Sequence, residues 1–169
     1  MPVPNVTLLA DHLRFIQSAV SITVASRDKR RIPSLCRALA CSVDSDASTK
    51  SGSRIQIVLN RSQCQQLLLD VAASQAIAAV FSEPASHRTL QVKGNEIKTA
   101  PISDNLLARV NESREHFADA ILPLGYSRAF SMHLLSYLPD NLITISFQPQ
   151  AIFEQSPGPS AGNPLAMSQ

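Results

Sequence analysis

The stretch AIAAVFSEPASHRTLQVKG, from Ala76 to Gly94, decides how this chain folds. Its first part, Ala76–Ser82, is an unbroken apolar run between turn residues, which predicts a β-strand buried on both faces. Pro84 has no N–H group, so the ladder of strand hydrogen bonds must end there. The second part, His87–Lys93, alternates in polarity and predicts a second strand that packs a core with one face only.

The alternation assigns each side chain of the second strand to a face, because residues two apart on a strand point the same way. Leu90 and Val92 are predicted to face the core, with Arg88 on their side. Thr89 and Gln91 are predicted on the opposite face, where they offer a hydroxyl and an amide to a ligand. An ordinary half-exposed antiparallel strand has the same pattern, so spacing alone leaves both interpretations open.

Composition places the chain among globular proteins. It has 169 residues, of which 44% are hydrophobic and 17% are charged, and a net charge of +2. This is enough for one domain with a sizeable core, and we predict a single domain over residues 1–169. Arg27–Arg31 is the densest basic cluster and reads as a hairpin turn, so nucleic acid is not an expected partner. No apolar run approaches the roughly 18 residues of a membrane span.

The cysteines and histidines argue against a metal site. The three cysteines lack CxxC spacing and no signal peptide precedes them, which favours a reducing, cytoplasmic location. Cys36 and Cys41 are five residues apart on one predicted strand, so we expect them on opposite faces, too far apart for a shared metal or disulfide. The four histidines show no ligand spacing, and no metal ligand is predicted.

The order of expected elements indicates the fold class. Further strands are expected at Ala19–Ser26, Pro33–Val43, Arg54–Asn60 and Leu142–Phe147, and helices at Gln63–Ser74, from Asp104 to about Gly125, and at Ser127–Tyr137. Closely spaced strands interrupted by a few helices predict an α+β fold, an antiparallel barrel with peripheral helices. Residues 156–169 are rich in Pro, Gly and Ser and are predicted to form an irregular tail.

No side chain is predicted to be catalytic. The sequence contains no GxGxxG, GxxxxGK[ST] or HExxH pattern. Any redox chemistry would therefore belong to a bound cofactor, which the protein would position.

Several segments, taken in order, resemble a known family. They are PSLCRAL around Arg37, the strand RIQIVLN, the helix start at Arg61, IAAVFSEPASHRTLQVKG, and the closing segment FEQSPGPSAG. Together they are similar to the pyridoxamine 5'-phosphate oxidase-like, FMN-binding split-barrel family, over about residues 8–162. The resemblance implies an antiparallel split β-barrel, bound FMN, a homodimer with the cofactor at the subunit interface, and an oxidoreductase activity on an unknown substrate.

The resemblance also implies the cofactor-binding residues. Arg37 matches a phosphate-contact position, and the segment Asn60, Arg61, Ser62 and Gln63 matches the strand-to-helix cradle of the phosphate. Thr89 and Gln91 match positions that face the flavin ring or ribityl chain, and Arg88 is a further candidate cofactor contact. Local chemistry agrees, since a helix start capped by Ser62, with Gln65 completing a capping box, would expose N–H groups beside guanidinium groups.

Two departures from the family keep other functions open. True pyridoxamine phosphate oxidases grip substrate with an Arg-and-His motif near the C-terminus, and this chain has neither residue after His133, which argues against that particular activity. One alternative is a non-catalytic split-barrel dimer that has lost the cofactor or uses it for sensing. Another is a haem-handling relative with His87 or His133 as the axial ligand, and a deazaflavin is a third possible ligand.

Overall fold

The computed structural model describes residues 6, 8–44 and 53–167. Its helices are α1 (Ala10–Ile16), α2 (Gln65–Ser74), α3 (Asp104–Ile121) and α4 (Arg128–Leu134). Its strands are β1 (Ser21–Arg27), β2 (Pro33–Asp44), β3 (Arg54–Asn60), β4 (Ile77–Ser82), β5 (Thr89–Ala100), β6 (Leu142–Glu154) and β7 (Pro164–Met167). None of the helices in these ranges is long and apolar enough to cross a membrane.

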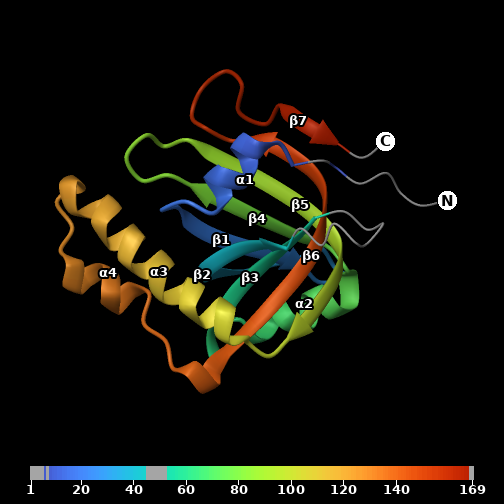
Figure 1. Ribbon diagram of the computed structural model, residues 1–169. Helices are drawn as coiled ribbons and strands as arrows, with labels where there is room; N and C mark the ends of the chain where they lie inside the picture. Colours follow the sequence, from blue (N-terminus) through green and yellow to red (C-terminus); the bar gives the residue numbers. More distant parts are fainter. Residues whose placement is uncertain (1–5, 7, 45–52, 168–169) are drawn as a thin grey trace.

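The strands form one antiparallel sheet that closes on itself. Its order is β3-β2-β1-β4-β5-β6-β7, and β3 also pairs with β6, so strands β1 to β6 make a closed barrel (Figure 1). β5 and β6 are long enough to turn the corner that closure requires, and β7 adds an outer strand to β6. The predicted α+β split-barrel fold is confirmed.

The core divides between the barrel interior and a layer outside it. The interior is filled from every barrel strand and from α1 and α2, with Phe81, Leu90 and Phe147 at no more than 1% exposure. The outer layer lies between β2, β3 and α3, where Leu39 and Val58 pack against Phe117 and its neighbours. Figure 1 shows α3 and α4 side by side over this part of the barrel. The helices are peripheral, as predicted.

The deciding stretch folds as two paired strands, with one correction. β4 and β5 pair from Ile77↔Gly94 to Ser82↔Thr89. The prediction that the first strand is buried on both faces is wrong, because burial alternates along β4 and only Ile77, Ala79 and Phe81 are buried. Its other face belongs to the outside of the barrel, where no helix of the described chain fully covers it.

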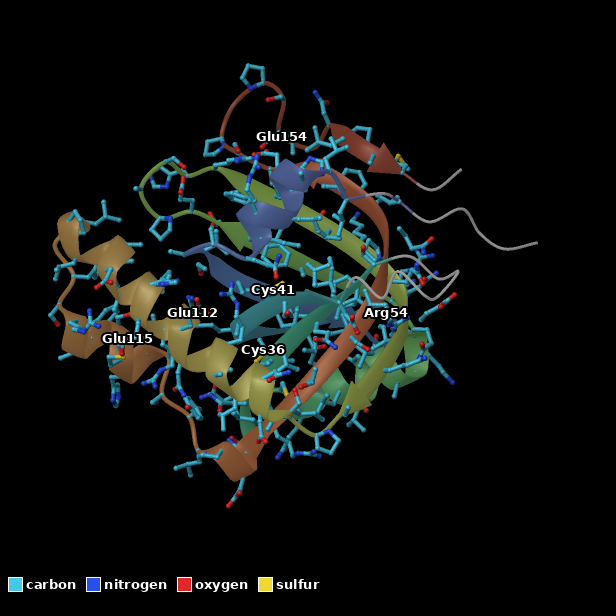
Figure 2. The ribbon with its side chains drawn as sticks, viewed as in Figure 1. Cys36, Cys41, Arg54, Glu112, Glu115 and Glu154 are labelled. Carbon is cyan, nitrogen blue, oxygen red and sulfur yellow. The ribbon has the colours of Figure 1, made fainter. Side chains whose placement is uncertain are left out.

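A β-bulge in β2 overturns the expected facing of the cysteines. The register of β2 against β3 shifts between Ala38 and Ala40. The extra residue returns Cys41 to the face of Cys36, and both thiols lie in the interior core (Figure 2). Burial raises the pKa of Cys41 to about 12, so this thiol stays protonated and packs as a small apolar group.

The C-terminal tail is more regular than predicted. After a series of turns, β7 pairs with β6, so the prediction of an irregular tail is wrong for Pro164–Met167. The turns are held to the barrel because the Thr89 N–H donates to Ser156 Oγ and the Glu154 N–H donates to the Asn163 carbonyl. Figure 2 shows Glu154 where β6 meets this loop. The low hydrophobicity of the segment concealed a strand that is held mainly by backbone hydrogen bonds.

The facing of β5 can be tested by a pair of substitutions. Leu90→Ala should lower the free energy of unfolding by about 2–5 kcal/mol, because Leu90 is 1% exposed and its loss leaves a cavity in the interior core. Lys93→Ala, on the outer face of the same strand, should change it by no more than about 1 kcal/mol, because Lys93 gives up only an exposed cation–π contact with Phe153. Urea denaturation measures both, and equal effects would contradict the assigned facing.

Candidate functional site

A cleft opens between the outer face of the barrel and the hairpin of α3 and α4. Its volume is about 600 Å³, within the range of small-molecule sites. We call it the Arg37 cleft. It is lined by Ser21, Arg37, Ser82, Glu83, Pro84, Ala85, His87, Phe117, Ile121, Leu124, Tyr126, Phe130 and Leu134.

One wall of the Arg37 cleft is polar and comes from β1, β2 and the β4–β5 turn. The Arg37 side chain is exposed and donates from Nη1 to Ser21 Oγ at 2.8 Å. Among the residues that the structure describes, no carboxylate lies within ion-pair distance of this guanidinium. Glu83 lies at the rim, and its carboxylate accepts a hydrogen bond from Ser86. This polar wall therefore presents the Arg37 guanidinium, whose remaining N–H groups are available to an anion.

The opposite wall of the Arg37 cleft is apolar and comes from α3, α4 and the turn between them. Tyr126 and Phe130 stack with their ring centroids 5.4 Å apart, and 51% and 48% of their surfaces are exposed. Exposed aromatic rings beside Leu124 and Leu134 form a surface suited to a planar apolar group. The two walls together suit a ligand that carries an anionic group beside a planar apolar group.

His87 reaches the same cleft from the tip of the β4–β5 turn. Its φ of 60° places it in the left-handed region, and the Glu83 N–H donates to the Arg88 carbonyl to close the turn. β5 consequently starts at Thr89, not at His87 as predicted. The strained backbone directs an imidazole to the rim of the cleft, where it can donate or accept a hydrogen bond.

Three of the predicted site residues lie on one face of the barrel. The register across β2, β1, β4 and β5 aligns Arg37, Thr23, Val80 and Gln91 in one row. Three strand spacings separate the ends of that row by about 14 Å. Thr89 stands beside it and its Oγ1 lies 2.7 Å from Oγ of Ser82, which lines the cleft. The predicted outward facing of Thr89 and Gln91 is confirmed.

The predicted segment Asn60–Gln63 lies at other surfaces. Asn60 and Gln63 line a separate hollow of about 260 Å³ with Ser136, Tyr137, Leu138 and Asn141. Asn60 is 5% exposed and its Nδ2 donates to the Ser136 carbonyl. Arg61 lines a third hollow, formed with α2, β5 and β6. Neither hollow shares a lining residue with the Arg37 cleft, so within one subunit the predicted residues do not converge.

The predicted cap at Ser62 is wrong. A short 3-10 turn, Arg61–Gln63, precedes α2, whose N-cap is Cys64 with no side-chain capping bond. The Ser62 N–H donates to Asn141 Oδ1 at 3.1 Å, and Asn141 Nδ2 donates to Ser62 Oγ at 2.8 Å. The Asn141 side chain, 79 residues away in the sequence, thus occupies the Ser62 N–H and hydroxyl that were expected to bind a phosphate.

Arg88 is engaged within the protein. Its Nη2 lies 2.5 Å from Asp11 Oδ2, and its guanidinium lies 4.3 Å from the ring centre of Phe15 on α1. The hydrogen bond and the charge of Arg88 together hold the pKa of Asp11 below its ordinary value. This contact fastens α1 to the β4–β5 turn, beside the first residues of β5.

The Arg88–Asp11 contact predicts a pH effect. A depressed carboxyl pKa stabilises the folded state above the unfolded pKa, and this contribution is lost as pH falls through the folded value. Arg88→Gln should raise the pKa of Asp11 toward its ordinary value, measured by an NMR titration of the side-chain carboxyl. Arg14→Gln is the control, since Arg14 lies 3.6 Å from Asp11 and affects it less. Equal shifts in the two variants would contradict this assignment.

Comparison with known proteins locates the fold. No protein-family model and no curated protein matches the sequence. Solved structures do match. An F420 reductase has a TM-score of 0.51 and 14% identity, covering 82% of this chain and 92% of its own. General stress protein 26 of Bacillus anthracis has a TM-score of 0.50 and 11% identity, covering 92% and 93%.

A third solved structure bears the name of the family suggested by the sequence. It is a candidate pyridoxamine 5'-phosphate oxidase from Lactobacillus delbrueckii, with a TM-score of 0.51 and 11% identity, covering 89% of this chain and 99% of its own. The structural similarity shows the fold alone at identities this low, and the ligand is argued from the residues of this chain. The chain has the split-barrel fold of the pyridoxamine 5'-phosphate oxidase-like proteins, in agreement with its sequence resemblance.

Proposed function

We propose that this protein is an FMN-binding split-barrel flavoprotein whose cofactor lies in the Arg37 cleft. The observation that carries the proposal is the Arg37 guanidinium, which faces a cavity of about 600 Å³ without a carboxylate partner in the described chain. FMN combines a phosphate, a polyol chain and a planar ring system. The cleft offers a matching cation, the hydroxyls of Ser21 and Ser82, and an aromatic wall.

The residues present fit the group in distinct roles. Arg37 would hold the phosphate through charge-assisted hydrogen bonds, and Tyr126 and Phe130 would contact the ring. Thr89 would position Ser82, to which its hydroxyl lies at 2.7 Å, and Gln91 would be a second polar contact along the outer face. When bound, FMN would supply the electron-transfer chemistry that no side chain of the cleft provides.

Substitution of Arg37 tests the proposal. Arg37→Ala should weaken FMN binding by about 1.5–3 kcal/mol, the range for a hydrogen bond to a charged group, as measured by quenching of flavin fluorescence. Phe130→Ala should also weaken it. Two controls lie outside the cleft: Arg61→Ala removes a guanidinium, and Leu138→Ala removes an exposed apolar side chain. FMN affinity that responds to Arg61 and not to Arg37 would place the phosphate elsewhere.

The activity has two candidate forms. An oxidoreductase would show reduction of bound flavin by NADH or NADPH at a useful rate, whereas a sensor or a protein without catalysis would not. Because one similar structure is an F420 reductase, a deazaflavin should be titrated beside FMN. A tighter complex with the deazaflavin would change the cofactor and retain the cleft.

A haem-handling function is favoured by one observation, the presence of His87 at the rim of the Arg37 cleft. An imidazole beside an apolar wall and a guanidinium suits an axial ligand and a propionate contact. His133 is exposed on α4 and does not line the cleft. Added haem should then give a Soret band that His87→Ala abolishes and His133→Ala retains. Without that band, this alternative fails.

We also propose a homodimer in which the outer face of the barrel is covered by a second copy. Leu35 is 69% exposed on β2, and Ala25, Ala78 and Val80 form a small-residue surface on β1 and β4 beside it. Light scattering should give twice the 18.3 kDa of one chain, and Leu35→Asp should shift the mass toward the monomer because it places a charge at the centre of the interface. A monomer in the unmodified protein would contradict the proposal.

A further inference from the structure

The Arg61 hollow lies on a different side of the structure, where α2 faces the far halves of β5 and β6. Its volume is about 340 Å³, and its lining residues are Arg61, Leu68, Val71, Ala72, Gln75, Ile97, Thr99 and Ile143. β4 starts at Ile77, opposite Gly94, so no strand among the described residues pairs with this edge of β5 beyond Gly94. α2 occupies that place and leaves the hollow between.

The floor of the Arg61 hollow is the interior core itself. Val71 and Ile143 belong to the buried core at 1% and 5% exposure, and Leu68 and Ile97 pack against it while reaching the surface. The rest of the lining, Arg61, Gln75 and Thr99, is polar. The apolar part of the hollow does not give water the hydrogen bonds it needs, so an apolar chain would bind more favourably than water along that part.

The rim of the hollow carries one charge, and it is positive. Arg61 is exposed, and no hydrogen bond or ion pair engages its side chain within residues 8–44 and 53–167. It is the one ionisable residue in the lining. The Gln75 side chain does not accept a hydrogen bond from Arg61. Its Oε1 accepts from the Ile97 N–H at 3.0 Å, and its Nε2 donates to the Val71 carbonyl.

We propose that the Arg61 hollow is a binding site for an aliphatic monocarboxylate of medium chain length. A guanidinium recognises a planar carboxylate with two parallel hydrogen bonds, and the chain would lie on Leu68, Val71, Ile97 and Ile143. The aliphatic walls select an anion that carries a hydrocarbon chain, and an aliphatic carboxylate has both parts. The hollow shares no lining residue with the Arg37 cleft, so it is separate from the proposed FMN site.

Octanoate titrated calorimetrically into the full-length protein tests the proposal. Binding should be saturable with one site per chain, and it should weaken about tenfold from octanoate to hexanoate, since each buried CH₂ contributes about a threefold to fourfold factor. Arg61→Gln should weaken octanoate at least tenfold, and uncharged octanamide should bind the unmodified protein at least tenfold more weakly. Octanamide binding as well as octanoate would overturn the proposed ligand class.

Matched substitutions on α2 locate the site. Ala72 lines the hollow, whereas its neighbour Ala73 is exposed outside it. Ala72→Phe should abolish octanoate binding and Ala73→Phe should preserve it, with circular dichroism confirming that both fold. Thr99→Phe obstructs the hollow from β5 and serves if Ala72→Phe does not fold. Equal binding in the obstructed and control variants, or the absence of saturable binding, would overturn the proposal.

Cross-titration separates this site from the flavin site. Arg37→Gln should retain octanoate affinity, and Ala72→Phe should retain FMN affinity if FMN binds as proposed. Loss of octanoate binding in Arg37→Gln would place the carboxylate in the Arg37 cleft and overturn the proposal. Octanoate binding by a protein that takes no FMN would leave the Arg61 hollow standing and remove the flavin function alone.

Discussion

The close approach of Gly94 to Phe147 is the constraint on which the barrel depends. A Cβ at residue 94 would stand 2.3 Å from Phe147 Cδ2 and 2.4 Å from the Gln148 carbonyl oxygen, distances that no packed carbon tolerates. Here the register of β5 against β6 shifts, and beyond Gly94 β5 leaves β4 and continues along β6, whose other edge pairs with β3 to close the barrel. Only glycine lets the two strands cross this closely. The Arg61 hollow lies beyond the turn.

Features that depend on local periodicity were predicted correctly from the sequence, whereas features that depend on contacts between distant residues were not. Leu90 and Val92 face the core as predicted, because a period of two is a local property of a strand. The facing of Cys41 was mispredicted, because a bulge changes the period and nothing in PSLCRALACSVD indicates where it falls. Ser62 was expected to cap a helix, yet Asn141 takes its N–H. The local capping propensity of Ser62 is outweighed by a tertiary hydrogen bond to Asn141 that forms only in the folded chain.

The candidate site was predicted in part for the same reason. The resemblance identified Arg37, and strand periodicity placed Thr89 and Gln91 on the outer face. Tyr126 and Phe130 were missed as cleft residues, because helix spacing reports which side chains are buried and these two are half-exposed. The sequence does offer one indication of them: both are large aromatic residues near a helix start, at positions that do not belong to the buried core. The cleft exists because α3 packs on β2, a contact of residues about 70 positions apart.

Arginine pairing provides a physical criterion for separating structural from ligand-directed positions. Arg88 and Arg128 contact carboxylates on neighbouring elements and fasten helices to them. Arg109 pairs with Glu112 within α3 and donates to the Cys41 and Gln17 carbonyls. Arg37 and Arg61 have no such partner in the described residues, but neither do the turn residues Arg27, Arg30 and Arg31. Lack of a partner is therefore insufficient, because an exposed guanidinium is well solvated by water. What distinguishes Arg37 and Arg61 is a cavity: each borders apolar walls, where a bound anion loses water and its attraction to the cation is screened less. The two cavities differ in their apolar walls, which are aromatic beside Arg37 and aliphatic beside Arg61. Both cavities carry one arginine, so the walls would select the ligand: a planar ring system beside Arg37 and an aliphatic chain beside Arg61.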